Sequence, residues 1–233
     1  MRLLALDTAS ARCSAALWCD GMLLCRAVPT AREHAQLILP MVESLLAESG
    51  SGLRQLDGIA FGRGPGSFTG LRVAAAVTQG LAAGADLPVF PVSDLRALAA
   101  QARAVQATAP ERGSPLLLAC MDARMGEIYW GAFESDPAVR IAPGYEEAVG
   151  PPDSLPVSLR GRVSGAAGRG FDAYPGIAQS LEISASCCLH EAEPDAADIA
   201  RLAVADLQAG AAWLDAGLAQ PVYLRNQVAK IPS

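Results

Sequence analysis

The stretch Gly62-Arg63-Gly64-Pro65-Gly66-Ser67-Phe68-Thr69-Gly70-Leu71-Arg72 sets the organisation of the chain. It follows the mostly apolar residues 56–61 and precedes a long alanine-rich segment. Glycine allows positive φ angles, and proline disfavours helical geometry in the residue before it, so this stretch is not the interior of a helix or strand. Ser67 or Thr69 can cap the helix that follows by accepting hydrogen bonds from its first N–H groups. The sequence predicts a strand, a tight loop and a helix N-terminus.

A loop of this kind can bind an anion, because free N–H groups and the helix dipole both favour negative charge. Two familiar motifs are not matched. A Walker A loop ends in Gly-Lys-Ser/Thr, whereas this loop has no lysine. A nucleophile elbow reads Gly-x-Ser-x-Gly, whereas Pro65 and Thr69 stand two residues either side of Ser67. A rigid turn that lets the helix approach closely and a phosphate contact therefore both remain open interpretations.

Composition and charge limit what the chain can do. Of its 233 residues, 52% are hydrophobic and 18% are charged, which is typical of a well-buried globular protein with one large or two small domains. The net charge is −6, so we do not expect the chain to bind nucleic acid alone. Any nucleic-acid role would run through a more basic partner.

The N-terminus and the cysteines indicate a cytoplasmic protein. Asp7 interrupts the apolar N-terminus too early for a signal-peptide core, and no stretch of about 18 uncharged apolar residues is present. The six cysteines form no Cys-x-x-Cys pair. In a reducing compartment they are expected to be small apolar side chains of the core, not metal ligands.

The first half of the chain has the pattern of an α/β lobe. Residues 2–6 read as a buried strand, and Asp20-Gly21 between two β-like runs indicates a two-residue hairpin. Ser93 or Asp94 is expected to cap a helix that runs to about residue 107. The other expected elements are helices over 33–48 (with Pro40 inside it) and 69–83, and a strand over 89–92.

A second lobe is expected after the Pro- and Gly-containing residues 108–115. Residues 116–122 resemble residues 3–7, since each is an apolar strand that ends in Asp and leads through a polar turn into another strand. The remaining expectations are short strands and loops over 134–180, an amphipathic helix within 194–210 and an extended segment over 221–226. We divide the chain into a lobe of residues 1–108 and a smaller lobe of residues 109–233, with the option that the C-terminal segment packs back on the first lobe.

The residues do not assemble a complete active site. His34 lies beside Glu33 and His190 lies in a Glu-rich stretch, and neither has a second histidine at the spacing of a helical metal pair. Asp122, Arg124 and Glu127 flank one turn and either form a site or fix the turn by ion pairing. Nothing combines a nucleophile, a base and an oxyanion donor. The sequence predicts no catalytic residue and no metal ligand.

Four stretches resemble one family. They are residues 62–72, Arg32-Glu33-His34 with Ile38-Leu39-Pro40, residues 121–129 (Met-Asp-Ala-Arg-Met-Gly-Glu-Ile-Tyr) and Pro221-Val222-Tyr223-Leu224-Arg225-Asn226. They span nearly the whole chain in the family's order, and the sequence is similar to the TsaB (YeaZ) family of bacterial tRNA threonylcarbamoyladenosine (t6A) biosynthesis. The resemblance implies the α/β actin/sugar-kinase-like (ASKHA) fold, in which two lobes repeat a sheet with helices, with the second lobe reduced here. For Tyr223-Leu224-Arg225 we expect tertiary anchoring of the chain end.

The resemblance also implies a role as an accessory subunit that is not an enzyme. Such a subunit dimerises with its paralogue, the transferase TsaD, and acts with the ATPase TsaE. Together they place a threonylcarbamoyl group on N6 of the adenosine 3′ of the anticodon. Cofactors are implied only at the partners, as ATP/ADP and Mg, with none intrinsic to this chain. The tRNA is bound only through the complex, and the chain alone is expected to form a homodimer.

Two helices are the expected docking surface. Apolar residues of the helix over 33–48 spread beyond the ~100° stripe that one core needs, and the small residues of the second helix allow another helix to approach closely. Core packing explains the same residues, and the resemblance favours pairing. The expected partner-binding residues are His34, Ile38, Met41, Val42, Leu45, Gly70, Leu71, Ala74 and Val77. Met41→Glu or Leu45→Glu is then expected to abolish pairing and leave the fold intact.

Two other functions are considered. The first is a small nucleotide-binding ATPase or kinase, since a carboxylate after the first strand supports Mg-nucleotide chemistry in this superfamily and Asp7 matches that place. Its candidate nucleotide- or phosphate-binding residues are Asp7, Thr8, Gly64, Gly66 and Ser67. Asp7 leads into Thr8-Ala9-Ser10 and not into a glycine-bearing loop, so bonding of Asp7 to turn amides is the alternative. The second is a protease, for which the sequence has neither a nucleophile triad nor a pair of histidine metal ligands.

Overall fold

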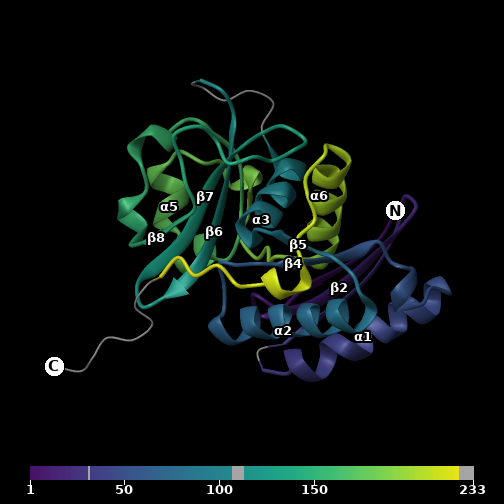
Figure 1. The fold of residues 1–233 in the computed structure, drawn as a ribbon. Helices are drawn as coiled ribbons and strands as arrows, with labels where there is room; N and C mark the ends of the chain where they lie inside the picture. Colours follow the sequence, from purple (N-terminus) through teal and green to yellow (C-terminus); the bar gives the residue numbers. More distant parts are fainter. Residues whose placement is uncertain (31, 107–112, 226–233) are drawn as a thin grey trace.

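The computed structural model describes residues 1–30, 32–106 and 113–225, which form two five-stranded sheets with two helices between them (Figure 1). The first sheet has the order β3-β2-β1-β4-β5. Its strands are β1 (Arg2–Asp7), β2 (Arg12–Cys19), β3 (Met22–Pro29), β4 (Gly58–Gly62) and β5 (Val89–Val92). β1, β2 and β3 are antiparallel neighbours, and β4 and β5 run parallel to β1. Asp20 and Gly21 both have positive φ, which confirms the predicted two-residue hairpin.

The second sheet repeats the first. Its strands are β6 (Leu116–Arg124), β7 (Glu127–Glu134), β8 (Ala148–Gly150), β9 (Val163–Ala167) and β10 (Cys188–Leu189). Read from β8, the order is β8-β7-β6-β9-β10, with β7 antiparallel to β6 and to β8, and with β9 and β10 parallel to β6. The similarity between residues 3–7 and 116–122 therefore corresponds to two equivalent central strands, β1 and β6. Both are buried along nearly their whole length, which is why their sequences are continuous apolar runs.

Two helices cover the outer face of the first sheet. These are α1 (His34–Ser49), which includes Pro40, and α2 (Phe68–Ala85), and they lie side by side (Figure 1). Both are within one residue of their predicted starts. Among the described residues, the second sheet has no comparable pair: its loops contain only the short helices α4 (Gly170–Ala173) and α5 (Gly176–Ser180) and several 3-10 turns. This is the reduction of the second lobe that the sequence predicted.

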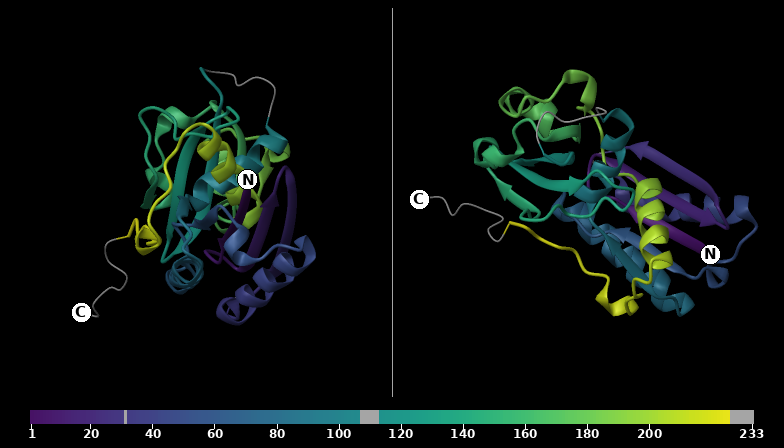
Figure 2. Two further views of the ribbon diagram at one scale, coloured as in Figure 1. Left: turned by 45° about the vertical axis from the view of Figure 1, so that its right-hand side comes forward. Right: turned by 90° about the horizontal axis from the view of Figure 1, so that it is seen from above.

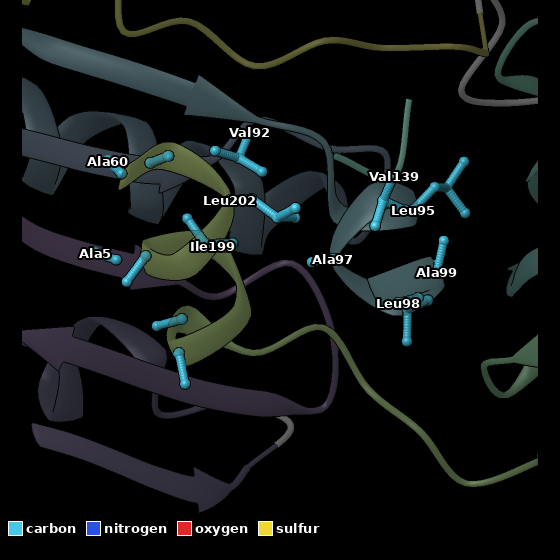
Figure 3. Packing of buried hydrophobic residues seen from close by; sticks show 14 of the residues in the cluster. Ala5, Ala60, Val92, Leu95, Ala97, Leu98, Ala99, Val139, Ile199 and Leu202 are labelled. Carbon is cyan, nitrogen blue, oxygen red and sulfur yellow. The ribbon is translucent and has the colours of Figure 1, made fainter. Parts of the chain in front are cut away.

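The other two helices, α3 (Asp94–Ala102) and α6 (Ala196–Gln208), each pack on the sheet of the other lobe. α3 follows the first sheet in the chain but packs on β6, β7 and β9, while α6 follows the second sheet and packs on β1, β2 and β4. Figure 3 shows Ile199 and Leu202 of α6 and Leu95 and Leu98 of α3 within one buried cluster. The two helices join the lobes through a shared core. α3 is shorter than predicted, since residues 103–105 form a 3-10 turn.

The C-terminal residues return to the first lobe. Leu214 pairs with Val89 at the edge of β5, and a 3-10 turn at Ala216–Leu218 lies beside α2. Residues 221–225 then run across to the turn between β6 and β7 (Figures 1 and 2). The predicted lobe boundary between residues 108 and 109, and Asn226 at the end of the expected extended segment, lie outside the described residues. Within the described part of the chain, no helix is long and apolar enough to cross a membrane.

Candidate functional site: the cleft between the lobes and the outer helices

A cleft of about 630 Å³ lies between the two lobes. The first lobe contributes the turn after β1 and the loop after β4, and the second lobe contributes the end of β6, the start of β7 and the region of α4. These strand ends meet because the carboxyl ends of equivalent central strands point to the same region, which is where ligands bind in α/β folds. The polar side chains that line the cleft are Ser10, His34, Ser67, Asp122, Arg124, Tyr129, Arg169, Asp172 and Glu193.

The loop after β4 is held tightly by its own lobe. The backbone N–H of Arg63 donates to Val92 O at 2.9 Å, that of Gly64 donates to the Asp94 carboxylate, and that of Ser67 donates to Ala9 O at 2.7 Å. Ser67 is the N-cap of α2, as predicted, and its Oγ accepts from Gly70 N at 3.4 Å. Because these N–H groups are satisfied within the chain, they are not free to bind a phosphate. The geometry is that of a rigid turn.

Two glycines of this loop allow the close approach of the turn after β1. A Cβ built on Gly66 would lie 2.4 Å from Ala9 O, and one built on Gly70 would lie 1.9 Å from Thr8 O. Thr8 Oγ1 also donates to Gly70 O at 2.7 Å. The glycine pattern therefore serves the packing of the two segments against each other, with α2 starting directly beneath the end of β1.

Only some of the predicted nucleotide- or phosphate-binding residues line the cleft. Gly66 and Ser67 line the cleft, whereas Asp7, Thr8 and Gly64 are buried and do not. Asp7 Oδ1 accepts from Ala9 N at 2.7 Å, which is the alternative of a carboxylate bonded to a turn amide. Asp7, Thr8 and Gly64 therefore lie away from the cleft surface, because residues 62–71 cover the end of β1, and their role in binding nucleotide or phosphate stays a prediction.

Asp7 and Asp94 form a buried pair of carboxyl groups that the sequence did not indicate. Both are fully buried, and a Cβ built on Gly62 would lie 3.0 Å from Asp7 Oδ1 and 2.4 Å from Asp94 Oδ1. Asp7 Oδ2 and Asp94 Oδ1 have no hydrogen-bond partner among the described residues. Burial raises the pKa of Asp7 to about 7. Burial, followed by the charge of Asp7, raises the pKa of Asp94 well above its usual range.

The remaining titratable candidates have structural partners. Asp122 forms an ion pair with Arg124 at 3.1 Å and accepts its backbone N–H at 2.8 Å, so this pair fixes the β6–β7 turn and also lines the cleft. Glu127 pairs with Arg225 instead. His34 Nε2 lies 2.9 Å from Ser10 O. Among the described residues, no group of three or more His, Cys, Asp or Glu side chains is placed to hold a metal ion.

Most of the residues predicted to bind a partner are buried in the first lobe. Ile38, Met41, Val42 and Leu45 of α1 point into the core under the first sheet, with Met41 8% exposed and Leu45 0% exposed. On α2, Gly70, Leu71 and Ala74 are also buried, Val77 is half-buried, and His34 at the start of α1 is buried. These buried residues do not form an accessible surface in the isolated chain, because each helix turns its most continuous apolar stripe towards the sheet, and their role in partner binding stays a prediction.

The accessible face of α1 and α2, here called the outer-helix face, consists of different residues. Leu39 on α1 is 43% exposed, and Pro40 beside it is also exposed. On α2, Ala76, Gly80 and Ala83 are exposed and follow one another at helical spacing of four and three residues. The signal for this face was present in the sequence as small residues on the side of α2 opposite Leu71, Ala74 and Thr78.

The fold and site define a class of protein. The chain has the actin/sugar-kinase-like (ASKHA) α/β fold. Its two lobes have the same strand order, two helices between them each pack on the sheet of the other lobe, and a cleft lies at the ends of the central strands. Residues 28–149 match the family model described as "TsaD: tRNA N6-adenosine threonylcarbamoyltransferase".

Individual relatives identify the family within this class. The chain is 39% identical over 241 residues to the "tRNA threonylcarbamoyladenosine biosynthesis protein TsaB" of Escherichia coli (strain K12), covering 100% of this chain and 99% of the relative. It is 48% identical over 130 residues to the Haemophilus influenzae protein of the same name, covering 56% and 52% of the two chains. The structure of YeaZ from Pseudomonas aeruginosa has a TM-score of 0.79 at 39% identity, with 96% and 99% covered. The chain belongs to the TsaB (YeaZ) family.

Proposed function

We propose that this protein is a non-catalytic subunit in the formation of t6A in tRNA, and that it pairs with and activates a TsaD-type transferase, together with a TsaE-type ATPase. The main support for a non-catalytic role is the loop after β4, whose Arg63, Gly64 and Ser67 N–H groups are bonded within the chain. An enzyme that transfers or hydrolyses phosphate needs such groups free to stabilise its transition state. ATP, ADP and Mg²⁺ then belong to the partner subunits, and tRNA binds through the complex.

The outer-helix face is the proposed docking surface. Ala76, Gly80 and Ala83 are small and exposed, so a partner helix can approach the α2 backbone closely, and Leu39 is an exposed apolar side chain on the neighbouring helix α1. A TsaD-type paralogue has helices of the same fold to place there. In the absence of the paralogue, a second copy of this chain is the proposed occupant, which gives a homodimer.

The docking proposal predicts the effect of Ala76→Glu. A charge placed in a desolvated helix interface is expected to weaken pairing by about 2–5 kcal/mol and to abolish co-elution with the TsaD-type partner. The fold is expected to be unchanged, because Ala76 is exposed. Ala205→Glu on the exposed side of α6 is the matched control and should co-elute normally. Normal co-elution of Ala76→Glu would show that this face is not the interface.

The deciding assay is reconstituted threonylcarbamoyl transfer to tRNA with the TsaD-type partner and the TsaE-type ATPase. Activity is expected to require this chain, to survive Ala205→Glu and to fail with Ala76→Glu. Met41→Glu is unsuitable here, since it places a charge in the core and is expected to unfold the protein. Full activity in the absence of this chain would refute the proposed role.

The second candidate is a small nucleotide-binding ATPase, supported by the cleft between the lobes. Magnesium-dependent ATP turnover by the isolated chain, lost in Arg124→Ala, would favour it. Arg124 lines the cleft and its side chain is 86% exposed, so its replacement leaves the core intact. Asp7→Ala is a poor test, because Asp7 is buried against Asp94 and the variant changes the core as well.

A further inference from the structure

Residues 221–225 form a segment, here called the C-terminal strap, that touches both lobes. It leaves the 3-10 turn beside α2 and ends at the β6–β7 turn, where Figure 1 shows it in yellow across the lower edge of the second lobe. Between the strap and the loop after β4 lies a pocket of only about 130 Å³, lined from the other side by Tyr129 of β7. The strap is therefore packed closely against both lobes.

The first-lobe end of the strap is fixed by backbone and side-chain contacts. Val222 N donates to Arg63 O at 2.7 Å, and a Cβ on Gly64 would lie 2.7 Å from Val222 O. The ring of Tyr223 lies 5.4 Å from that of Phe68, and its OH accepts from Arg72 Nε at 3.2 Å. The Arg72 guanidinium lies 3.9 Å from the centre of the Phe68 ring. The rings of Tyr223 and Phe68 are tilted by 40°, and aromatic and cation–π contacts of this kind restrict side-chain motion.

The second-lobe end is fixed by Arg225. Its guanidinium forms an ion pair with Glu127 and donates to Arg124 O at 3.5 Å, and only 17% of the Arg225 side chain is exposed. The contacted turn is an unusual one, since Arg124 and Met125 both have positive φ, at 63° and 58°. Non-glycine residues reach this region at a cost of about 1 kcal/mol each, and the contacts of Arg225 with Arg124 and Glu127 help to hold the turn in this conformation.

We infer that the C-terminal strap is a clasp that holds the two lobes at a fixed separation across the cleft. Its first-lobe contacts are with Arg63, Phe68 and Arg72, and its second-lobe contacts are with Arg124 and Glu127. Ser67 and Phe68 on one side of the cleft, and Asp122 and Arg124 on the other, are the residues beside these anchors. The strap therefore adds a second connection between the lobes at the cleft, besides the core that α3 and α6 share, and opening the strap loosens the cleft walls beside its two anchors. This inference is independent of the proposed function.

Hydrogen exchange on the full chain tests the clasp. Arg225→Ala removes the ion pair with Glu127 in the second lobe. Tyr223→Ala removes the contacts with Phe68 and Arg72 in the first lobe. Each is expected to speed amide exchange about tenfold in both the β6–β7 turn (residues 122–127) and the loop at residues 62–70, while exchange in β1 stays unchanged. The double variant Arg225→Ala/Glu127→Ala is expected to exchange no faster than Arg225→Ala alone, because both changes break the same ion pair.

Arg160→Ala is the matched control. It breaks an arginine–carboxylate pair with Glu182 that lies entirely within the second lobe, so exchange at residues 62–70 should stay at the wild-type rate. Two results would overturn the inference. One is wild-type exchange at both segments in Arg225→Ala and Tyr223→Ala. The other is a uniform increase that includes β1, since the strap would then contribute only to global stability.

Discussion

The Asp94→Asn variant is expected to be more stable than the wild-type protein at pH 8, by about 2–4 kcal/mol, and nearly equal to it at pH 4. Two buried carboxyl groups meet above Gly62, and each has an oxygen atom without a hydrogen-bond partner among the described residues. An asparagine at position 94 can still accept the Gly64 N–H. The substitution removes one of the two buried ionisable groups, and the NH₂ group of the asparagine can donate a hydrogen bond to Asp7.

The pH dependence follows from the direction of the two pKa shifts. The pKa of Asp7 rises from 3.8 to about 7 on folding, and that of Asp94 rises well above 3.8. The folded state therefore holds protons that the unfolded chain has already lost. The resulting stabilisation is complete below pH 4 and is lost as the pH rises towards and through 7. Because pH also acts on the rest of the protein, the difference in stability between variant and wild type is the quantity to measure.

Denaturation followed by circular dichroism at pH 4, 6 and 8 measures this difference. The control is Asp153→Asn, which neutralises an exposed aspartate and is expected to change stability by less than about 0.5 kcal/mol at every pH. Asp7→Asn is expected to act in the same direction as Asp94→Asn, since either variant leaves only one carboxyl in the pair. A stability gain that is the same at pH 4 and pH 8 would contradict the pairing of the two carboxyl groups.

Gly70→Ala is expected to destabilise the protein by about 3–5 kcal/mol. The added Cβ would lie 1.9 Å from Thr8 O, which is far inside the contact distance of two atoms. Neither partner can move easily, because Gly70 is in the first turn of α2 and Thr8 follows the central strand β1. The loss should appear as a lower midpoint in urea with an unchanged slope.

Gly80→Ala, in the same helix, is the matched control with the opposite sign. A Cβ at Gly80 meets nothing within 4 Å, and glycine within a helix costs about 1 kcal/mol relative to alanine. This variant is expected to stabilise the monomer by about 1 kcal/mol, measured at protein concentrations too low for pairing through the outer-helix face. Equal stability of Gly70→Ala and wild type would show that α2 is not held by its close approach to β1.

The sequence by itself determined the elements and their repetition. The continuous apolar runs of β1 and β6 required central strands, Asp20-Gly21 required a hairpin, and Ser67 and Ser93 marked the starts of α2 and α3. These features depend on residues close together in the chain, whose backbone preferences and hydrogen bonds are local. The family motifs were likewise readable, because each is a short run of neighbouring residues.

Only the tertiary structure decided which side chains are accessible and which meet. The apolar stripe of α1 gave no means of telling core from interface, and packing on the first sheet buried Met41 and Leu45 and exposed Leu39. The Asp7–Asp94 pair joins the end of β1 to the start of α3. The C-terminal strap contacts residues near 65 in the first lobe and residues near 125 in the second. Such contacts arise because burial and ion pairing depend on distance in space, which separation along the chain does not specify.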